Sequence, residues 1–107
     1  MSNVVALLSA SKALEIIRRL SEKSHNVRFT EHAQERMEER DITLFDIQNI
    51  LKKGDIKGNP TKCPKTKNGW ICKIVRHARG NRDIGVITVI VNMEHLRIVT
   101  VEWEDLR

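Results

Sequence analysis

The chain has 107 residues, which is enough for one domain with a single core and too few for a second, so we expect one domain over residues 1–107. Lysine and arginine total 19 against 14 aspartate and glutamate, and the net charge of +5 favours a nucleic-acid partner, although many basic proteins bind none. The two cysteines are too few for a disulfide scaffold and lack the paired spacing of a zinc site, which favours a reduced, cytoplasmic setting. The apolar residues 4–8 are far too few to cross a bilayer and follow no positive region, so neither a membrane span nor a signal peptide is expected.

Three helices are predicted in the first half of the chain. Apolar residues recur every three or four positions over residues 4–23, as in an amphipathic helix, and Ser9 or Ser11 could cap a shorter version. Thr30 is a good N-cap for a second helix, whose acidic first residue suits the helix N-terminus. The Thr-x-x-Asp pattern at residues 43–46 resembles a capping box for a third helix, which runs to a Lys-Lys-Gly stop.

The second half changes character and predicts a sheet. Residues 55–69 contain two glycines, two prolines and four lysines, which indicates a loop, with room for a short strand at its start. Three runs rich in β-branched residues, 70–78, 83–92 and 96–103, predict an antiparallel meander whose apolar middle strand is the buried centre. Helices first and a sheet afterwards predict an α+β fold, with N-terminal helices packed on one face of a C-terminal antiparallel sheet of three to four strands.

The second predicted helix carries a histidine and two arginines at intervals of four residues: His32, Arg36 and Arg40. Residues four apart lie along one side of a helix, so the three form a slanted stripe beside the apolar positions Ala33 and Met37. Two arginines at this spacing repel each other by a few tenths of a kcal/mol. We therefore expect either a carboxylate of the protein or a phosphate of a ligand beside them.

Ion pairs within the protein are the simpler explanation for either arginine alone. Arg36 could pair with Glu39 on its own helix. Arg40 has three candidate partners, namely Asp41, Glu102 and Glu104.

A second group of cations belongs to the predicted hairpin and the loop before it. The group consists of Lys62, Lys65, Lys67, Lys73, Arg76, Arg79 and Arg82. Positive charge from two parts of the chain is what a groove that follows phosphates requires, although an ordinary solvated hairpin also carries such residues. His77 lies in the first strand of this hairpin, and an imidazole there could exchange protons with a ribose hydroxyl or a leaving oxygen.

Other kinds of site lack support in the sequence. There is no glycine-rich phosphate loop, no paired acidic metal site and no nucleophile motif around a serine or cysteine. The four histidines are dispersed without ligand spacing, so we expect neither a metal nor a cofactor. Cys63 is interpreted as a loop thiol and Cys72 as a packed strand residue.

The sequence HAQERMEERDITLFDIQNILKKG, followed by a meander that ends LRIVTVEW, resembles a known family. These are small bacterial proteins of unknown function with the helix motif His-Ala-x-x-Arg-Met-x-x-Arg-x-Ile-Thr, and the likeness runs from Phe29 to Trp103. The resemblance implies the barnase, EndoU, colicin and RelE-like fold, whose members are mostly metal-independent ribonucleases and often toxins of toxin–antitoxin pairs. The antitoxin in this branch is often a small zinc-finger protein. The implied site consists of His32, Arg36, Arg40 and Thr100, completed by His77 and Arg76.

We therefore expect an endoribonuclease, the toxin of a type II toxin–antitoxin system, that cleaves mRNA and inhibits translation and growth. His32 would act as general base or acid, Arg36 and Arg40 would clamp the phosphate, and Thr100 would bind a phosphoryl oxygen or orient His32. Two alternatives remain: a non-catalytic module that holds RNA or an acidic protein on the same surface, and a structural role in which the two arginines are ion-pair partners.

Overall fold

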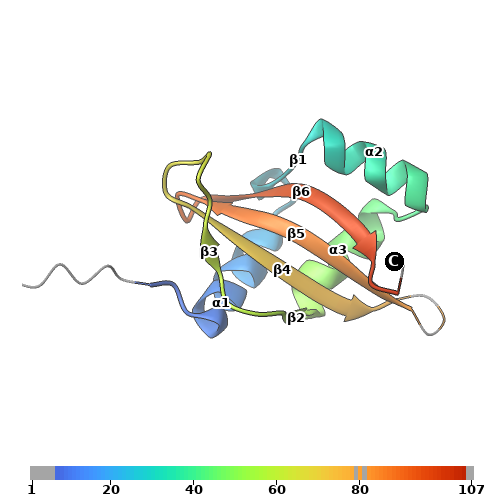
Figure 1. Cartoon of the computed structure of the whole chain (residues 1–107), viewed down its shortest axis with the longest axis horizontal. Helices are drawn as coiled ribbons and strands as arrows, with labels where there is room; N and C mark the ends of the chain where they lie inside the picture. The colour runs from blue at the N-terminus through green and yellow to red at the C-terminus, as the bar shows by residue number, and fades with distance from the viewer. Residues whose placement is uncertain (1–6, 79, 81, 106–107) are drawn as a thin grey trace, which may run out of the picture.

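Three helices and six strands make up the regular structure of the computed structural model, which describes residues 7–78, 80 and 82–105 (Figure 1). The helices are α1 (Ala10–Ser21), α2 (Glu31–Arg40) and α3 (Leu44–Lys53), with a 3₁₀ turn, η1 (Ser24–Asn26), after the first. The strands are β1 (Val27–Phe29), β2 (Asp55–Ile56), β3 (Thr61–Lys62), β4 (Gly69–His77), β5 (Asp83–Val91) and β6 (His95–Trp103). The predicted α+β class is confirmed. No helix in the described ranges is long and apolar enough to span a membrane.

The helices begin at the capping residues that the sequence predicts. Ser9 accepts a hydrogen bond from the backbone N–H of Lys12, and Thr30 accepts one from that of Ala33. The capping box at Thr43 is complete in both directions. The first predicted helix, over residues 4–23, is too long, because α1 begins only after its Ser9 cap and ends at Ser21. Residues 4–6 of that prediction lie outside the described part.

The sheet contains the predicted meander but is larger and mixed. Its strand order is β1-β6-β5-β4-β2, with β3 also paired to β4, and β5 is the predicted buried centre. The expected antiparallel sheet of three to four strands is wrong in number and in direction, because β1 pairs parallel to β6. β2 lies where the sequence leaves room for a short strand, at the start of the loop over residues 55–69. β1 and β3 are not predicted, because their three and two residues are too few to show the alternation that identifies a strand.

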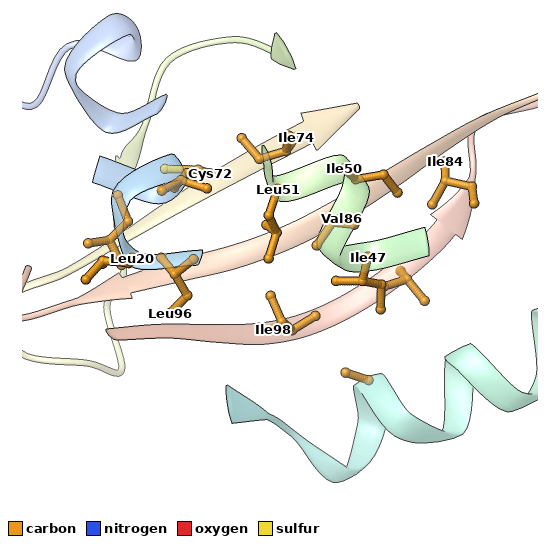
Figure 2. Packing of buried hydrophobic residues seen from close by; sticks show 14 of the residues in the cluster. Leu20, Ile47, Ile50, Leu51, Cys72, Ile74, Ile84, Val86, Leu96 and Ile98 are labelled. Atoms are coloured by element: carbon orange, nitrogen blue, oxygen red, sulfur yellow. The ribbon is translucent and has the colours of Figure 1, made fainter. Parts of the chain in front are cut away.

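The core lies between the sheet and two of the helices. Figure 2 shows Leu20 of α1 and Ile47, Ile50 and Leu51 of α3 over the strands that carry Cys72, Ile74, Val86, Leu96 and Ile98. All of these side chains are buried. The prediction that helices cover one face of the sheet therefore holds for α1 and α3.

Helix α2 departs from that prediction, because it lies along the outer edge of β6 (Figure 1). β1 pairs with residues 96–98 of β6 and leaves the next carbonyls of that edge open. Thr30 Oγ1 donates to the carbonyl of Val99 at 3.2 Å, and Arg40 Nη1 donates to that of Val101 at 3.2 Å. Both ends of α2 are thereby attached to the sheet, and the carbonyls of Val99 and Val101, which do not pair with β1, gain hydrogen-bond donors.

The two cysteines should differ sharply in reactivity. A hydrogen bond with the Thr66 side chain, assisted by backbone N–H groups, lowers the pKa of the half-buried Cys63 thiol, whereas burial raises the pKa of Cys72 to about 12. Because the thiolate is the reactive form, we expect an aromatic disulfide reagent at mildly alkaline pH to titrate one thiol in the native protein and two after denaturation. Cys63→Ser should abolish the native reaction, and a native reaction that survives this change would contradict the assignment.

Candidate functional site

His32 and Arg36 lie on α2 between its two attachments to β6. His32 is in the first turn and exposed, and within the described part of the chain its imidazole has no hydrogen-bond partner. Arg36 is one turn further, with its side chain 33% exposed, and its Nη1 pairs with Glu39 Oε2 at 2.5 Å. The ion pair that the sequence predicts for Arg36 is therefore present at the surface.

Arg40, the third member of the stripe, holds the helix to the sheet. Its Nη1 binds the Val101 carbonyl, and its own carbonyl accepts a hydrogen bond from Trp103 Nε1 at 2.9 Å. Glu102 and Glu104, two of the three predicted partners, bind Lys73 instead, at 3.2 and 2.9 Å. Arg40 thus has a structural task that His32 and Arg36 do not share.

Thr100 lies on the face of the sheet turned away from α1 and α3. A bulge in β6 places Val99 between Ile98, which pairs with Thr88, and Thr100, which pairs with Ile87. This extra residue shifts the alternation, so Leu96 and Ile98 before the bulge and Val101 and Trp103 after it are all in the core. Thr100 is therefore directed to the opposite face, which carries none of the described helices (Figure 1).

Lys73 shares that face and lies in the same cross-strand row as Ile87 and Thr100. Partial burial acts to lower the pKa of Lys73, but the hydrogen bonds and charges of Glu104 and Glu102 outweigh it and raise that pKa above its ordinary value. With neighbouring strands about 4.8 Å apart, Lys73 on β4 and Thr100 on β6 are separated by roughly 10 Å. Lys73 is charged but already holds two carboxylates, so it is not a free cation for RNA.

Arg76 and His77 lie at the end of β4, beside the opposite edge of the sheet from α2. Both line a groove of about 630 Å³ that also includes Lys53, Lys57 and Asp83. His77 is exposed, and its Nδ1 is 3.1 Å from Asp83 Oδ1. Since β5 lies between β4 and β6, these residues are at least about 10 Å from the strand that carries α2.

The remaining predicted cations are scattered. Arg82 binds Asp105 through its Nε at 3.1 Å and stacks on the Trp103 ring, with 4.0 Å from the guanidinium carbon to the ring centroid. Lys65 is exposed in the loop between β3 and β4, and Arg79 lies outside the described residues. In the described part, no group of three or more His, Cys, Asp or Glu could hold a metal ion.

The comparison with family models gives one match. Residues 29–103 match the model of DUF4258, a domain of unknown function. The chain belongs to this family. A search of the curated proteins and a search of the solved structures each found no match.

The segment that matches DUF4258 contains α2, the groove and the face of the sheet that carries Thr100, but it does not contain α1. Ile16, Ile17 and Leu20 of α1 nevertheless fill the core, and Arg18 Nη2 donates to the carbonyl of Gly54 at 2.8 Å. The helix before the matched DUF4258 segment therefore completes its fold.

The DUF4258 domain thus presents two separate polar groups that suit phosphate chemistry. On α2, an exposed imidazole able to transfer protons lies one turn from a guanidinium able to bind two oxygens of a phosphate. In the groove, Lys53 and Lys57 lie beside Arg76. The sequence does not single out these two lysines, since along the chain Lys53 is part of a helix stop and Lys57 is part of a loop.

Proposed function

We propose that this DUF4258 protein is a metal-independent endoribonuclease of the barnase, EndoU, colicin and RelE-like superfamily, acting as the toxin of a type II toxin–antitoxin system. The observation that carries the proposal is the division of tasks on α2. Thr30 and Arg40 attach the helix to β6, whereas among the described residues the side chains of His32 and Arg36, which lie between these attachments, make no hydrogen bond or ion pair to another element. An exposed imidazole and guanidinium on a fixed helix are a preorganised pair for phosphate chemistry.

Transphosphorylation of RNA needs only groups of this kind. A base removes the 2′-hydroxyl proton, the 2′-oxygen attacks the phosphorus, and the P–O bond to the 5′-oxygen breaks as an acid protonates that oxygen. His32 transfers the proton in one of these steps, and Arg36 stabilises the charge on the phosphoryl oxygens. The products carry a 2′,3′-cyclic phosphate and a 5′-hydroxyl.

The pair between Arg36 and Glu39 does not prevent this role. Glu39 is 56% exposed, and an exposed pair three residues apart on a helix contributes less than about 1 kcal/mol. A phosphate that binds the guanidinium through two oxygens can displace such a carboxylate. The pair also resolves the repulsion expected between Arg36 and Arg40 in the absence of RNA.

The proposal includes mRNA as the substrate, free or on the ribosome, and the cytoplasm as the site of action. The partner is an antitoxin that neutralises the protein, for which the resemblance implies a zinc-finger type. The net charge of +5 suits the RNA partner, because a polyanion is attracted to a positive field.

Induced expression in bacteria tests the proposal, with growth and the integrity of total RNA followed together. Wild type should arrest growth and fragment RNA, and His32→Ala should do neither. His25→Ala is the matched control, because His25 is also an exposed histidine but lies in η1, and it should behave as wild type. Normal growth with intact RNA, from soluble wild type at good yield, would favour the non-catalytic module.

A further inference from the structure

A groove with an excess of cations lies where the end of α3 meets β2 and the end of β4. Its volume is about 630 Å³, and its charged lining consists of Lys53, Asp55, Lys57, Arg76, His77 and Asp83. Three of these are permanent cations and two are carboxylates, one of which, Asp83, is already hydrogen-bonded by His77. The groove therefore has a positive surplus with His77 counted as neutral.

The guanidinium of Arg76, in the wall of this groove, has a hydrogen-bond partner for one of its nitrogens and none for another, among the described residues. Its Nη1 donates to the carbonyl of Lys53 at 3.3 Å, which caps the end of α3. Its Nε is buried and, within the described residues, has no hydrogen-bond partner. A buried polar group without a partner is costly, more so when it is charged, and native structures rarely keep one without a reason.

The lysines of the groove are available for a ligand. Lys53 is exposed, and no carboxylate of the described ranges pairs with it. Lys57 is 68% exposed, and its Nζ is 3.6 Å from Glu104, a long contact to a carboxylate that Lys73 approaches more closely, at 2.9 Å. Neither lysine packs in the core, so both can reorient toward an anion at little cost.

We propose that this groove binds a phosphate of the RNA backbone, as a subsite remote from the phosphate that is cleaved; the inference rests on the proposed ribonuclease function. The groove and α2 lie on opposite sides of β5. One strand of RNA that occupied both would therefore cross the sheet face between them, which carries Thr100 and none of the described helices. Neighbouring strands of the sheet are about 4.8 Å apart, so the separation of at least about 10 Å places the groove and α2 at different phosphates of one RNA strand. Lys53 and Lys57 supply the charge, and Arg76 forms the wall of the subsite.

Binding of a single-stranded 2′-O-methyl RNA tests the subsite, because this probe has no free 2′-hydroxyl and cannot be cleaved by the proposed reaction. The double variant Lys53→Gln/Lys57→Gln should bind the probe about tenfold more weakly than wild type at moderate salt. The slope of log Kd against log salt should fall by about 0.7 for each phosphate that the variant no longer neutralises.

The matched control is Lys12→Gln/Lys23→Gln, which removes the same charge at α1 and just after it. Both control lysines are exposed, and Lys12, like Lys57, has one carboxylate within 4 Å: Glu15 at 3.4 Å for Lys12, and the less exposed Glu104 at 3.6 Å for Lys57. The control should lose affinity only slightly and keep the wild-type slope, and thermal melting should show both double variants folded. Equal losses in the two double variants, or no binding by wild type, would overturn the subsite.

The assay separates this inference from the proposed function. A specific loss in Lys53→Gln/Lys57→Gln, found together with no cleavage of ordinary RNA, would keep the groove as an RNA-binding site and refute the enzyme. Cleavage by wild type without any difference between the double variants would refute the groove alone.

Discussion

Purified Arg36→Lys protein should cleave RNA about 10²–10³-fold more slowly than wild type, which is the loss typical of removing one preorganised donor to a transition state. Lysine keeps the charge but replaces the planar fork of two donors by a point charge, so it cannot bind two phosphoryl oxygens at once. Binding of uncleavable 2′-O-methyl RNA should change less than about twofold, because simple electrostatic attraction depends on the charge that lysine retains. Initial cleavage rates and anisotropy titrations on the same preparations measure the two effects.

Arg28→Lys is the control for this prediction, since Arg28 is an exposed arginine on β1, at the same edge of the sheet. It should leave both cleavage and binding as in wild type. Equal and small changes of rate and affinity in Arg36→Lys would favour the binding module. A clear drop in the melting temperature of that variant would instead support the structural role for Arg36.

Gly54→Ala should lower the free energy of unfolding by about 3 kcal/mol, at the upper end of the range for overpacked sites. A Cβ at Gly54 would lie 2.6 Å from the carbonyl oxygen of Ile50, 2.8 Å from a methyl carbon of Ile74 and 3.0 Å from the carbonyl oxygen of Val75. Two of these three atoms belong to the backbone, so α3 and β4 would have to move apart. The melting temperature should fall by roughly 15 °C for a domain of this size.

Gly58→Ala separates this steric effect from the conformational role of glycine. Gly58 has φ +76, and a Cβ there would meet no atom within 4 Å, whereas Gly54 has φ −75, which alanine adopts without strain. The control should therefore lose only about 1 kcal/mol, the cost of a left-handed conformation. Equal losses at both glycines would show that close packing at Gly54 is not the reason for glycine there.

The features that the sequence predicts correctly are those that neighbouring residues determine. The caps at Ser9, Thr30 and Thr43 act on backbone groups three residues away, so their chemistry can be read locally. The meander follows from three long runs of β-branched residues joined by short turns. In the same way, the helical spacing of His32 and Arg36 predicts that both lie along α2, as the structure shows.

The features that the sequence does not predict depend on partners far along the chain. Arg40 binds a backbone carbonyl at Val101, and a carbonyl has no signature in the sequence that could identify it as a partner. The bulge at Val99 sets the face on which Thr100 lies, and one extra residue in a strand leaves the apolar pattern ambiguous. The separation of the two basic groups follows from strand order, which no spacing along the chain reveals.

The attachment of α2 to β6 joins a helix that is synthesised early to a strand that is synthesised late. Thr30 and its partner carbonyl at Val99 are 69 residues apart, and Arg40 and Val101 are 61 apart. Contacts between such distant segments form late in folding, and chains emerge from the ribosome with the N-terminal part first. Helix α2 therefore has no edge to attach to until residues 95–103 have left the exit tunnel. A nascent chain would carry His32 and Arg36 on an unanchored helix, so under the proposed function it would not cleave RNA before α2 is attached to β6.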